Sequence, residues 1–162
     1  MKRFGLAVCL GSLLALAAPV GAGAAGPYDF VSGAIKRVGL SDSTDRHFIL
    51  SAHNGPQGPN GQYTATYGKG KSAVGYKGTV TCVNVVGNLA RVGIQITESS
   101  RSDVVVGSYE ILRVTDYGNP SGDDQMDSLS PGVFTSVPAN CADPYEDPTP
   151  TYAGNFTVND AG

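Results

Sequence analysis

The stretch that decides the fold is Gly78–Thr97, GTVTCVNVVGNLARVGIQIT. Apolar and polar residues alternate on both sides of the central Gly87-Asn88 pair, and β-branched residues dominate, which is typical of two strands. A Gly-Asn pair suits the positive φ angles of a two-residue hairpin turn, so we expect the two strands to pair antiparallel. The expected partners are Val85 with Ala90, Val83 with Val92, Thr81 with Ile94 and Thr79 with Ile96.

This register also predicts which face of the hairpin is buried. The paired Val, Ile and Thr residues share one face, and its apolar content marks it as the core side. Cys82 then points to the opposite face, beside Gly93. A one-residue bulge would reverse the two faces beyond it, because side chains alternate with a period of two.

Similar patterns recur along the rest of the chain, and no stretch shows a helical period. The sequence has 22 Gly, 10 Pro and only 15% charged residues, which excludes a coiled coil, a long-helix protein or a collagen. We expect an all-β fold of about seven to eight antiparallel strands with one disulfide, either a Greek-key sandwich or a small β-barrel. The expected strands are Asp29–Val38, Arg46–His53, Gln62–Tyr67, Ala73–Val86, Leu89–Thr97, Asp103–Thr115, Val133–Val137 and Asn155–Val158.

Residues 1–24 have the composition of a secretory signal peptide. Lys2 and Arg3 precede an uncharged stretch rich in Leu and Ala, and Ala22-Gly23-Ala24 fits a small-residue cleavage signal. The apolar stretch is broken by Pro and Gly, whereas a membrane helix needs about 20 apolar residues. We therefore expect secretion, with residues 25–162 forming a single β domain that has no membrane span.

Removal of the signal peptide leaves two cysteines, Cys82 and Cys141. An even pair in a small exported domain predicts a disulfide. The two residues are 59 positions apart, and the chain-entropy model gives about 4 kcal/mol of stabilisation for closing such a loop. If this bond forms, the Pro-rich acidic segment 138–152 crosses the outer face at Cys82 and covers it.

The block Gly78–Thr97 resembles a group of small secreted actinobacterial proteins of unknown function, with the pattern G-x-V-T-C-x-x-V-x-G-N-x-A-x-x-G. Three further blocks are similar and occur in the same order along the chain: VSGAIKR at Val31–Arg37, FILSAHNGPQG at Phe48–Gly58 and GNFTVNDA at Gly154–Ala161. The resemblance implies a secreted β-rich domain whose last strand belongs to the fold. It implies no activity, cofactor or catalytic residue.

The charge of the chain is uneven. Beyond the signal peptide there are nine basic and fourteen acidic residues, and no Lys or Arg follows residue 113. An anionic chain with an acidic C-terminal third predicts that nucleic acid is not a partner. A component of the cell envelope and a small-molecule ligand stay open as partners.

The sequence offers little for catalysis. His47 and His53 lie six residues apart on one expected strand, which separates them by roughly 20 Å and excludes a shared metal ion. No G-x-S-x-G nucleophile motif occurs. We predict no catalytic residue and no cofactor apart from a possible calcium ion, and we keep a weak secreted hydrolase that uses one histidine as an alternative.

The calcium candidate is the segment Asp116–Asp127. Its oxygen ligands would be Asp116, Asn119, Asp123, Asp124 and Asp127 on a glycine-containing loop, and calcium prefers oxygen ligands. The spacing departs from that of an EF-hand. A calcium loop and a solvated loop whose Asp and Asn side chains bind turn backbone groups both stay open.

Aromatic residues and glycines raise the possibility of a ligand site. Tyr63 and Tyr67 share one face of a strand with Ala65 between them, and Tyr76 falls on the next strand. Such rows bind glycans or apolar ligands in some proteins and cover a sheet in others. Glycines in the long strands would thin the wall of a barrel and leave room for a ligand. They are Gly75, Gly78, Gly93 and Gly107.

Together these observations favour a secreted, non-catalytic β domain that acts by binding or as a structural component in the extracellular space or cell envelope. The first alternative is a carrier that holds a small apolar ligand in a barrel lumen. The second is the weak hydrolase.

Overall fold

The computed structural model describes residues 28–38, 44–118, 124–128, 136, 141 and 152–162. The described residues form one short 3-10 turn, η1 (Gly70–Ser72), and eight strands. The strands are β1 (Asp29–Val38), β2 (Asp45–Gly55), β3 (Gly58–Tyr67), β4 (Val74–Val86), β5 (Leu89–Ser99), β6 (Tyr109–Thr115), β7 (Asp124–Ser128) and β8 (Tyr152–Asn159).

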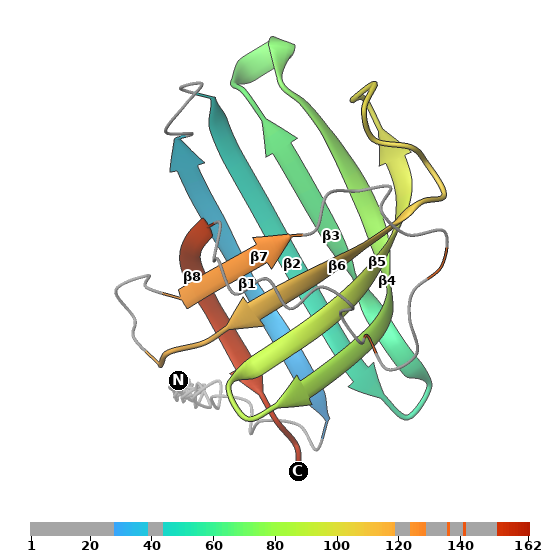
Figure 1. Cartoon of the computed structure of the whole chain (residues 1–162), viewed down its shortest axis with the longest axis vertical. Coiled ribbons are helices and arrows are strands. Elements are labelled where there is room, and N and C mark those ends of the chain that lie inside the picture. Colours follow the sequence, from blue (N-terminus) through green and yellow to red (C-terminus); the bar gives the residue numbers. More distant parts are fainter. Residues whose placement is uncertain (1–27, 39–43, 119–123, 129–135, 137–140, 142–151) are drawn as a thin grey trace, which may run out of the picture.

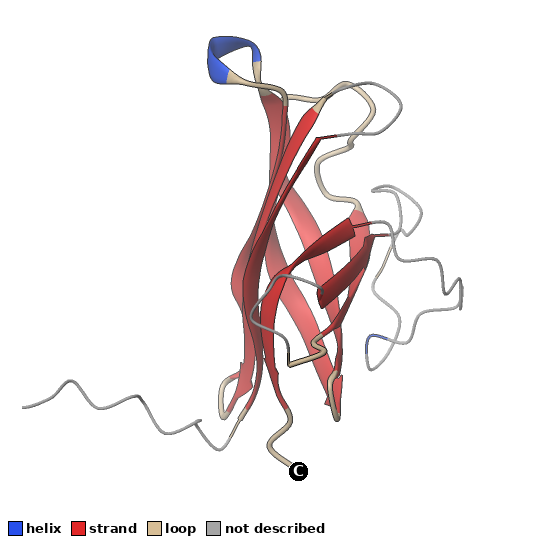
Figure 2. Cartoon of the chain, turned by 90° about the vertical axis from the view of Figure 1, so that its left-hand side faces the viewer, coloured by secondary structure: helices blue, strands red, loops and turns tan. Residues whose placement is uncertain are grey.

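Each strand pairs antiparallel with the next one in the chain, and β8 returns to pair with β1, which closes a barrel (Figure 1). The all-β prediction is confirmed, and of its two alternatives the barrel is the one observed. Neighbouring strands follow the order of the chain, so the connections are up-and-down rather than Greek-key. Figure 2 shows the strands as curved layers, with the C-terminus at the end opposite η1.

Alternation between apolar and polar residues along the strands gives the closed sheet an apolar inner face. In β2 the residues Phe48, Leu50 and Ala52 are buried, whereas Ile49 and Ser51 between them are exposed. The inward residues of all the strands form one apolar core inside the barrel. Its largest buried aliphatic members are Ile35, Leu50, Ile94, Ile96, Leu112 and Met126.

The hairpin of β4 and β5 confirms half of the predicted register. Val85 pairs with Ala90 and Val83 with Val92, and Cys82 lies opposite Gly93 on the outer face. Beyond Cys82 the prediction is wrong. The structural reason is a bulge between Val80 and Cys82.

The bulge contains Thr81, whose hydroxyl donates a hydrogen bond to the carbonyl of Gly93 at 3.1 Å. Because an extra residue shifts the pairing by one, Val80 instead of Thr81 faces Ile94, and Gly78 instead of Thr79 faces Ile96. Val80 is therefore buried and Thr79 exposed. The two threonines thus leave the core face to which the simple alternation assigned them.

Three other expected elements differ from the observed ones. The strand predicted at Asp103–Thr115 begins only at Tyr109, because residues 100–108 form a loop in which Gly107 adopts a φ of 91°. β3 begins at Gly58, earlier than predicted, because its hairpin with β2 turns tightly at Pro56-Gln57. β7 occupies residues for which a loop was predicted, and the strand predicted at Val133–Val137 lies outside the described residues except for Ser136.

The predicted disulfide joins Cys82 and Cys141, whose Cα atoms lie 5.8 Å apart. Gly93 and Ile111 continue the row that Cys82 begins across β4, β5 and β6. Ile111 and Cys141 are both buried although this row faces outward. Cys141 itself therefore lies buried against the outer face at Cys82, and the predicted crossing by the rest of segment 138–152 stays a prediction.

The predicted signal peptide lies outside the described residues, as does most of segment 138–152. Within the part of the chain that the structure describes, no helix is long and apolar enough to cross a membrane.

Candidate functional site

Four aromatic rings gather inside one end of the barrel, which we call the aromatic end. Phe48 of β2, Ala65 of β3 and Tyr76 of β4 occupy one row of paired residues, and Tyr63 and Tyr67 flank Ala65 on the same face. The predicted aromatic row thus points into the barrel.

The rings form a closed circuit of contacts. Phe48 stacks on Tyr63 at 6.4 Å between ring centroids and meets Tyr67 edge-on at 5.7 Å. Tyr76 meets Tyr63 edge-on at 5.9 Å and stacks on Tyr67 at 6.3 Å. All four distances lie in the favourable range for aromatic pairs, which each contribute about 0.5–1.5 kcal/mol beyond burial.

A carboxylate lies inside the barrel beside these rings. Glu110 is the second residue of β6, faces inward with Leu112 and Val114, and is fully buried. The hydroxyl of Tyr76 donates a hydrogen bond to Glu110 Oε1 at 3.3 Å. Burial raises the pKa of Tyr76 far above its usual range, and the neighbouring carboxylate of Glu110 raises it further. Tyr76 therefore stays protonated and remains a hydrogen-bond donor.

The loop between β5 and β6, residues 100–108, lies over this end of the barrel. Its base is fixed on one side by Ser100, whose backbone N–H donates to the carbonyl of Gly75 and whose Oγ accepts from the N–H of Gly75, both at 2.8 Å. On the other side Gly107 donates its N–H to the carbonyl of Ile96 at 2.8 Å. Val104 packs into the barrel core from this loop.

The same loop places a cation on the aromatic circuit. The guanidinium carbon of Arg101 lies 4.1 Å from the centroid of the Tyr67 ring, a cation–π contact. Arg101 also donates from Nε to Asp103 Oδ1 at 3.0 Å and from Nη2 to Asp103 Oδ2. This pairing raises the pKa of Arg101 and lowers that of Asp103. A second guanidinium, that of Arg46, lies 6.0 Å from the same ring.

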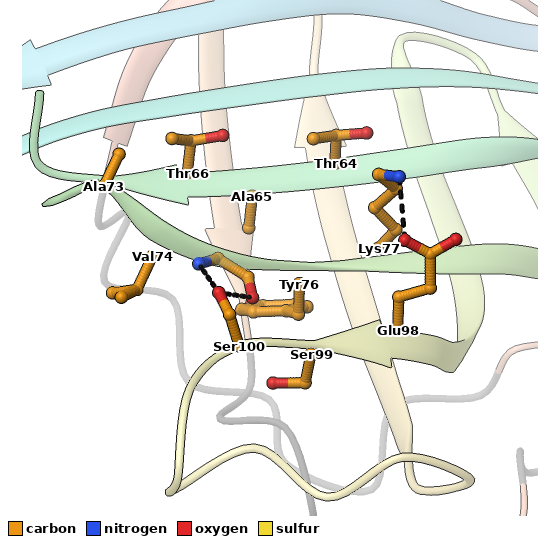
Figure 3. Close-up of a pocket in the computed structure, with 11 residues that line it drawn as sticks. Thr64, Ala65, Thr66, Ala73, Val74, Tyr76, Lys77, Glu98, Ser99 and Ser100 are labelled. Carbon is orange, nitrogen blue, oxygen red and sulfur yellow. Dashed lines mark hydrogen bonds and ion pairs between the residues drawn. The ribbon is translucent and has the colours of Figure 1, made fainter. Parts of the chain in front are cut away.

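A hollow of about 360 Å³ adjoins the contact between Ser100 and Gly75 (Figure 3). Thr64 and Thr66 line it from the opposite side of β3 to Ala65, and the ion pair of Lys77 with Glu98 lines it further along. Both charged side chains of that pair are more than half exposed, so water screens their attraction. Ala65 and Tyr76 of the aromatic end line this hollow as well.

Two of the predicted calcium ligands, Asp116 and Asp124, lie at the other end of the barrel, which we call the aspartate end. Asp116 accepts from the backbone N–H of Gly118 at 2.6 Å and of Val158 at 3.0 Å. Asp124 is buried and accepts from the N–H of Tyr117 at 2.8 Å and of Phe156 at 2.7 Å.

Asp116 and Asp124 thus bind backbone N–H groups, as expected for a loop that is held by its own Asp side chains. They are two of the five predicted ligands. Asn119 and Asp123 lie outside the described residues, and the side chain of Asp127 is not described. The described residues contain no group of three or more His, Cys, Asp or Glu side chains placed to hold a metal ion. Calcium binding stays a prediction.

The histidines and glycines singled out earlier are dispersed. His47 and His53 are exposed on β2, and Gly107 lies in the β5–β6 loop. Gly78 faces the interior, but a Cβ there would lie 2.2 Å from Ile94 Cγ2, so the side chain of Ile94 already occupies the space beside it.

Comparisons with known proteins add no assignment. No protein-family model matches the chain, and the searches of curated proteins and of solved structures returned no match.

Glu110 and Arg101 were absent from the predicted site. The signal for Glu110 was available, because alternation along β6 places it on the same face as Leu112 and Val114, where a charge is unexpected. Arg101 had no comparable signal, since its position depends on how the β5–β6 loop folds back over the barrel.

Proposed function

We propose that the protein is a secreted, non-catalytic binding protein that holds a small, largely apolar molecule at the aromatic end of the barrel. The observation that carries this proposal is a fully buried carboxylate, Glu110, beside four aromatic rings and beneath a surface loop. Ligand sites typically combine apolar and aromatic walls with a few convergent polar groups. The barrel end with Tyr63, Tyr67, Tyr76 and Glu110 has that combination.

The energetics of Glu110 support a role beyond folding. Burying a polar side chain costs free energy unless hydrogen bonds compensate it. An apolar residue would also fit this inward position, since its neighbours Leu112 and Val114 are apolar. A polar group at such a position is of the kind that ligand sites use to orient a molecule within apolar walls.

The β5–β6 loop provides a means of access. Opening it would expose Val104, at a cost of about 1.5–3 kcal/mol, and would release the contact of Arg101 with Tyr67, worth about 1–2 kcal/mol when partly desolvated. The Arg101–Asp103 ion pair lies within the loop and would be retained. The strands need not separate for the loop to open.

Binding accounts for the site better than catalysis does. Tyr76 and Glu110 are hydrogen-bonded to each other. The raised pKa of Tyr76 makes its hydroxyl a poor general acid, because it does not readily give up its proton. His47 and His53 are exposed on the outside of β2, away from the interior aromatic circuit.

The test is a titration with N-phenyl-1-naphthylamine, a neutral aromatic probe whose fluorescence rises in apolar surroundings. We expect saturable binding at one site per chain, weakened at least tenfold by Tyr67→Ala. The matched control is Tyr117→Ala, which removes an exposed tyrosine at the aspartate end and leaves binding unchanged. Absence of saturable binding, or equal binding by both variants, would contradict the proposal.

A further inference from the structure

We infer that one edge of β4 is an interface between two copies of this chain: residues Cys82–Val86 pair antiparallel with the same residues of a second copy and form a two-fold symmetric dimer. This inference goes beyond the proposed function and does not depend on it, because the edge lies outside the aromatic end. Three features of the described residues carry it, namely the one-sided pairing of β4, the direction of its backbone groups and the absence of charge along the edge.

Beyond its bulge, β4 pairs on one side only. β3 pairs with β4 as far as Thr79, whereas β5 pairs with it as far as Val86. In Figure 1 the half of the β4–β5 hairpin next to its turn extends away from β3. Among the described residues no strand pairs with the side of Cys82–Val86 that is turned away from β5, which we call the open edge. An edge of this kind presents backbone donors and acceptors to another strand.

The hairpin turn determines which backbone groups point to the open edge. Val86 and Leu89 flank the two-residue turn and form a hydrogen-bonded pair of the antiparallel ladder. Hydrogen-bonded and non-hydrogen-bonded pairs alternate, so Val85 and Val83 occupy non-hydrogen-bonded positions opposite β5. The N–H and C=O groups of Val83 and Val85 therefore point to the open edge.

The open edge has a defined end on each side. Gly87 continues the row of Val83 and Val85, and its N–H donates to Asp160 Oδ2 at 2.7 Å. A side chain of the same chain thus accepts the outward N–H at the turn. At the other side the row ends at the bulge that contains Thr81. The backbone groups of Val83 and Val85 lie between these two ends.

The open edge lacks charged and Pro residues that would keep another strand away. The stretch Cys82–Val86 contains no Lys, Arg, Asp, Glu or Pro, whereas natural edge strands are commonly protected by such residues. The side chains of Val83 and Val85 are buried in the core. The row therefore offers uncharged backbone groups, and a second copy of the chain brings an identical row without electrostatic repulsion.

The two rows fit each other around a two-fold axis at Asn84. In this register Val83 of each chain lies opposite Val85 of the other, and the two residues exchange backbone hydrogen bonds. The two Asn84 residues form a non-hydrogen-bonded pair on the outer face, with Cβ atoms about 4.5–5.5 Å apart. An amide side chain both donates and accepts, so the two can bond to each other.

Charge on the neighbouring strand does not oppose this pairing. Arg91 of β5 lies opposite Asn84 within one chain. In the dimer the two Arg91 residues are separated by three strand spacings, about 14 Å. Salt screens exposed charges at distances beyond about 8–10 Å, so their mutual repulsion is weak.

The first experiment is sedimentation equilibrium of the exported chain with its disulfide intact. We expect the mean mass to rise from that of one chain towards that of two between about 1 and 300 μM, because a short strand pair is a small interface that binds weakly. A chain that stays monomeric over this range would overturn the inference.

A charged variant locates the interface. Asn84→Lys places two ammonium groups opposite each other on the axis and should raise the Kd of the dimer roughly fivefold or more, since like charges directly opposite destabilise a strand pair. The matched control is Thr79→Lys, which adds the same charge at an exposed position of β4 that has a strand on both sides. It should leave the Kd unchanged. Equal effects of the two variants, or no effect of Asn84→Lys, would overturn the inference.

Mixing two variants tests the two-fold register. Asn84→Asp should weaken the dimer as Asn84→Lys does, because it also places like charges on the axis. An equimolar mixture of the two variants should restore dimers, since opposite charges then meet across the strands. A mixture with no more dimer than the separate variants would overturn the pairing at Asn84.

Amide hydrogen exchange tests the unmodified chain, so its result does not depend on how a variant folds. The N–H groups of Val83 and Val85 should exchange more slowly at about 300 μM than at about 10 μM, because they are bonded only in the dimer. The N–H of Asn84 points to β5 and should exchange at the same rate at both concentrations. Exchange at Val83 and Val85 that is independent of concentration would overturn the inference.

Discussion

The acidic side chains at the two ends of the barrel have different kinds of partner. At the aspartate end Asp116, Asp124 and Asp160 each accept two backbone N–H groups, from turns and from β8. At the aromatic end Glu110 instead contacts the hydroxyl of a tyrosine in a side-chain cluster. The first arrangement fixes the backbone where β8 closes the barrel, and the second joins side chains inside the barrel. Burial of an acidic side chain is therefore interpreted together with the groups that it contacts.

The largest expected effect comes from Asp124. Asp124→Ala removes the acceptor of two backbone N–H groups and leaves those of Tyr117 and Phe156 without it, so we expect a loss of about 3–5 kcal/mol in the free energy of unfolding. Urea unfolding followed by circular dichroism measures it. Glu110→Gln is the comparison at the other end and should cost less than about 1 kcal/mol. Similar losses in the two variants would remove the distinction between the ends.

Reduction of the disulfide should have the next largest effect. The double variant Cys82→Ser/Cys141→Ser removes the bond that closes a loop of 59 residues. It should lower the free energy of unfolding by about 3–4 kcal/mol. Because the bond lies on the outer wall, the double variant should bind N-phenyl-1-naphthylamine as the parent chain does. Loss of probe binding in a folded double variant would show that the outer segment shapes the aromatic end.

Alkaline pH should act on the aromatic end. The pKa of Tyr76 is raised in the folded protein, so its contribution to stability is present below the unfolded-state value near 10 and declines as the pH rises above it. The slope for one such group is about 1.4 kcal/mol per pH unit. Melting temperatures between pH 9 and pH 11.5 should fall less steeply in Tyr76→Phe than in the parent chain. Parallel curves would contradict the buried, protonated state of Tyr76.

Acid pH should act on the aspartate end, with the smallest effect. The backbone N–H groups of Gly87 and Gly162 lower the pKa of Asp160 below its usual 3.8. Its stabilisation is therefore present above about pH 4 and is lost as the pH falls through the folded-state value. Asp160→Asn should be slightly less stable than the parent at pH 7 and equal to it near pH 2. A difference that persists at pH 2 would require another cause.

The sequence predicted those parts of the fold that depend on local pattern. The Gly87-Asn88 turn correctly predicted the pairs Val85–Ala90 and Val83–Val92, and the position of Cys82 followed. The pattern failed at Thr81, because a bulge is stabilised by a hydrogen bond to the partner strand that no local rule anticipates.

The remaining errors have similar causes. The run of three valines at 104–106 has the pattern of a strand, yet Val104 turns inward and Val105 and Val106 are 65% and 55% exposed, because the loop folds over the barrel end. β7 consists largely of polar residues, which favour a loop by composition, and it forms a strand because β6 and β8 pair with it on both sides. The row of tyrosines was visible in the sequence and alternation along β6 could have indicated Glu110, whereas the position of Arg101 depends on how the β5–β6 loop folds.

The most direct test of ligand binding at the aromatic end is a titration with N-phenyl-1-naphthylamine followed through backbone amide shifts in NMR spectra. We predict that the shifts change in the β5–β6 loop and around Tyr67, Tyr76 and Glu110. The amides bonded to Asp116, Asp124 and Asp160 should remain unchanged. Changes confined to the aspartate end or to the outer wall would contradict the account.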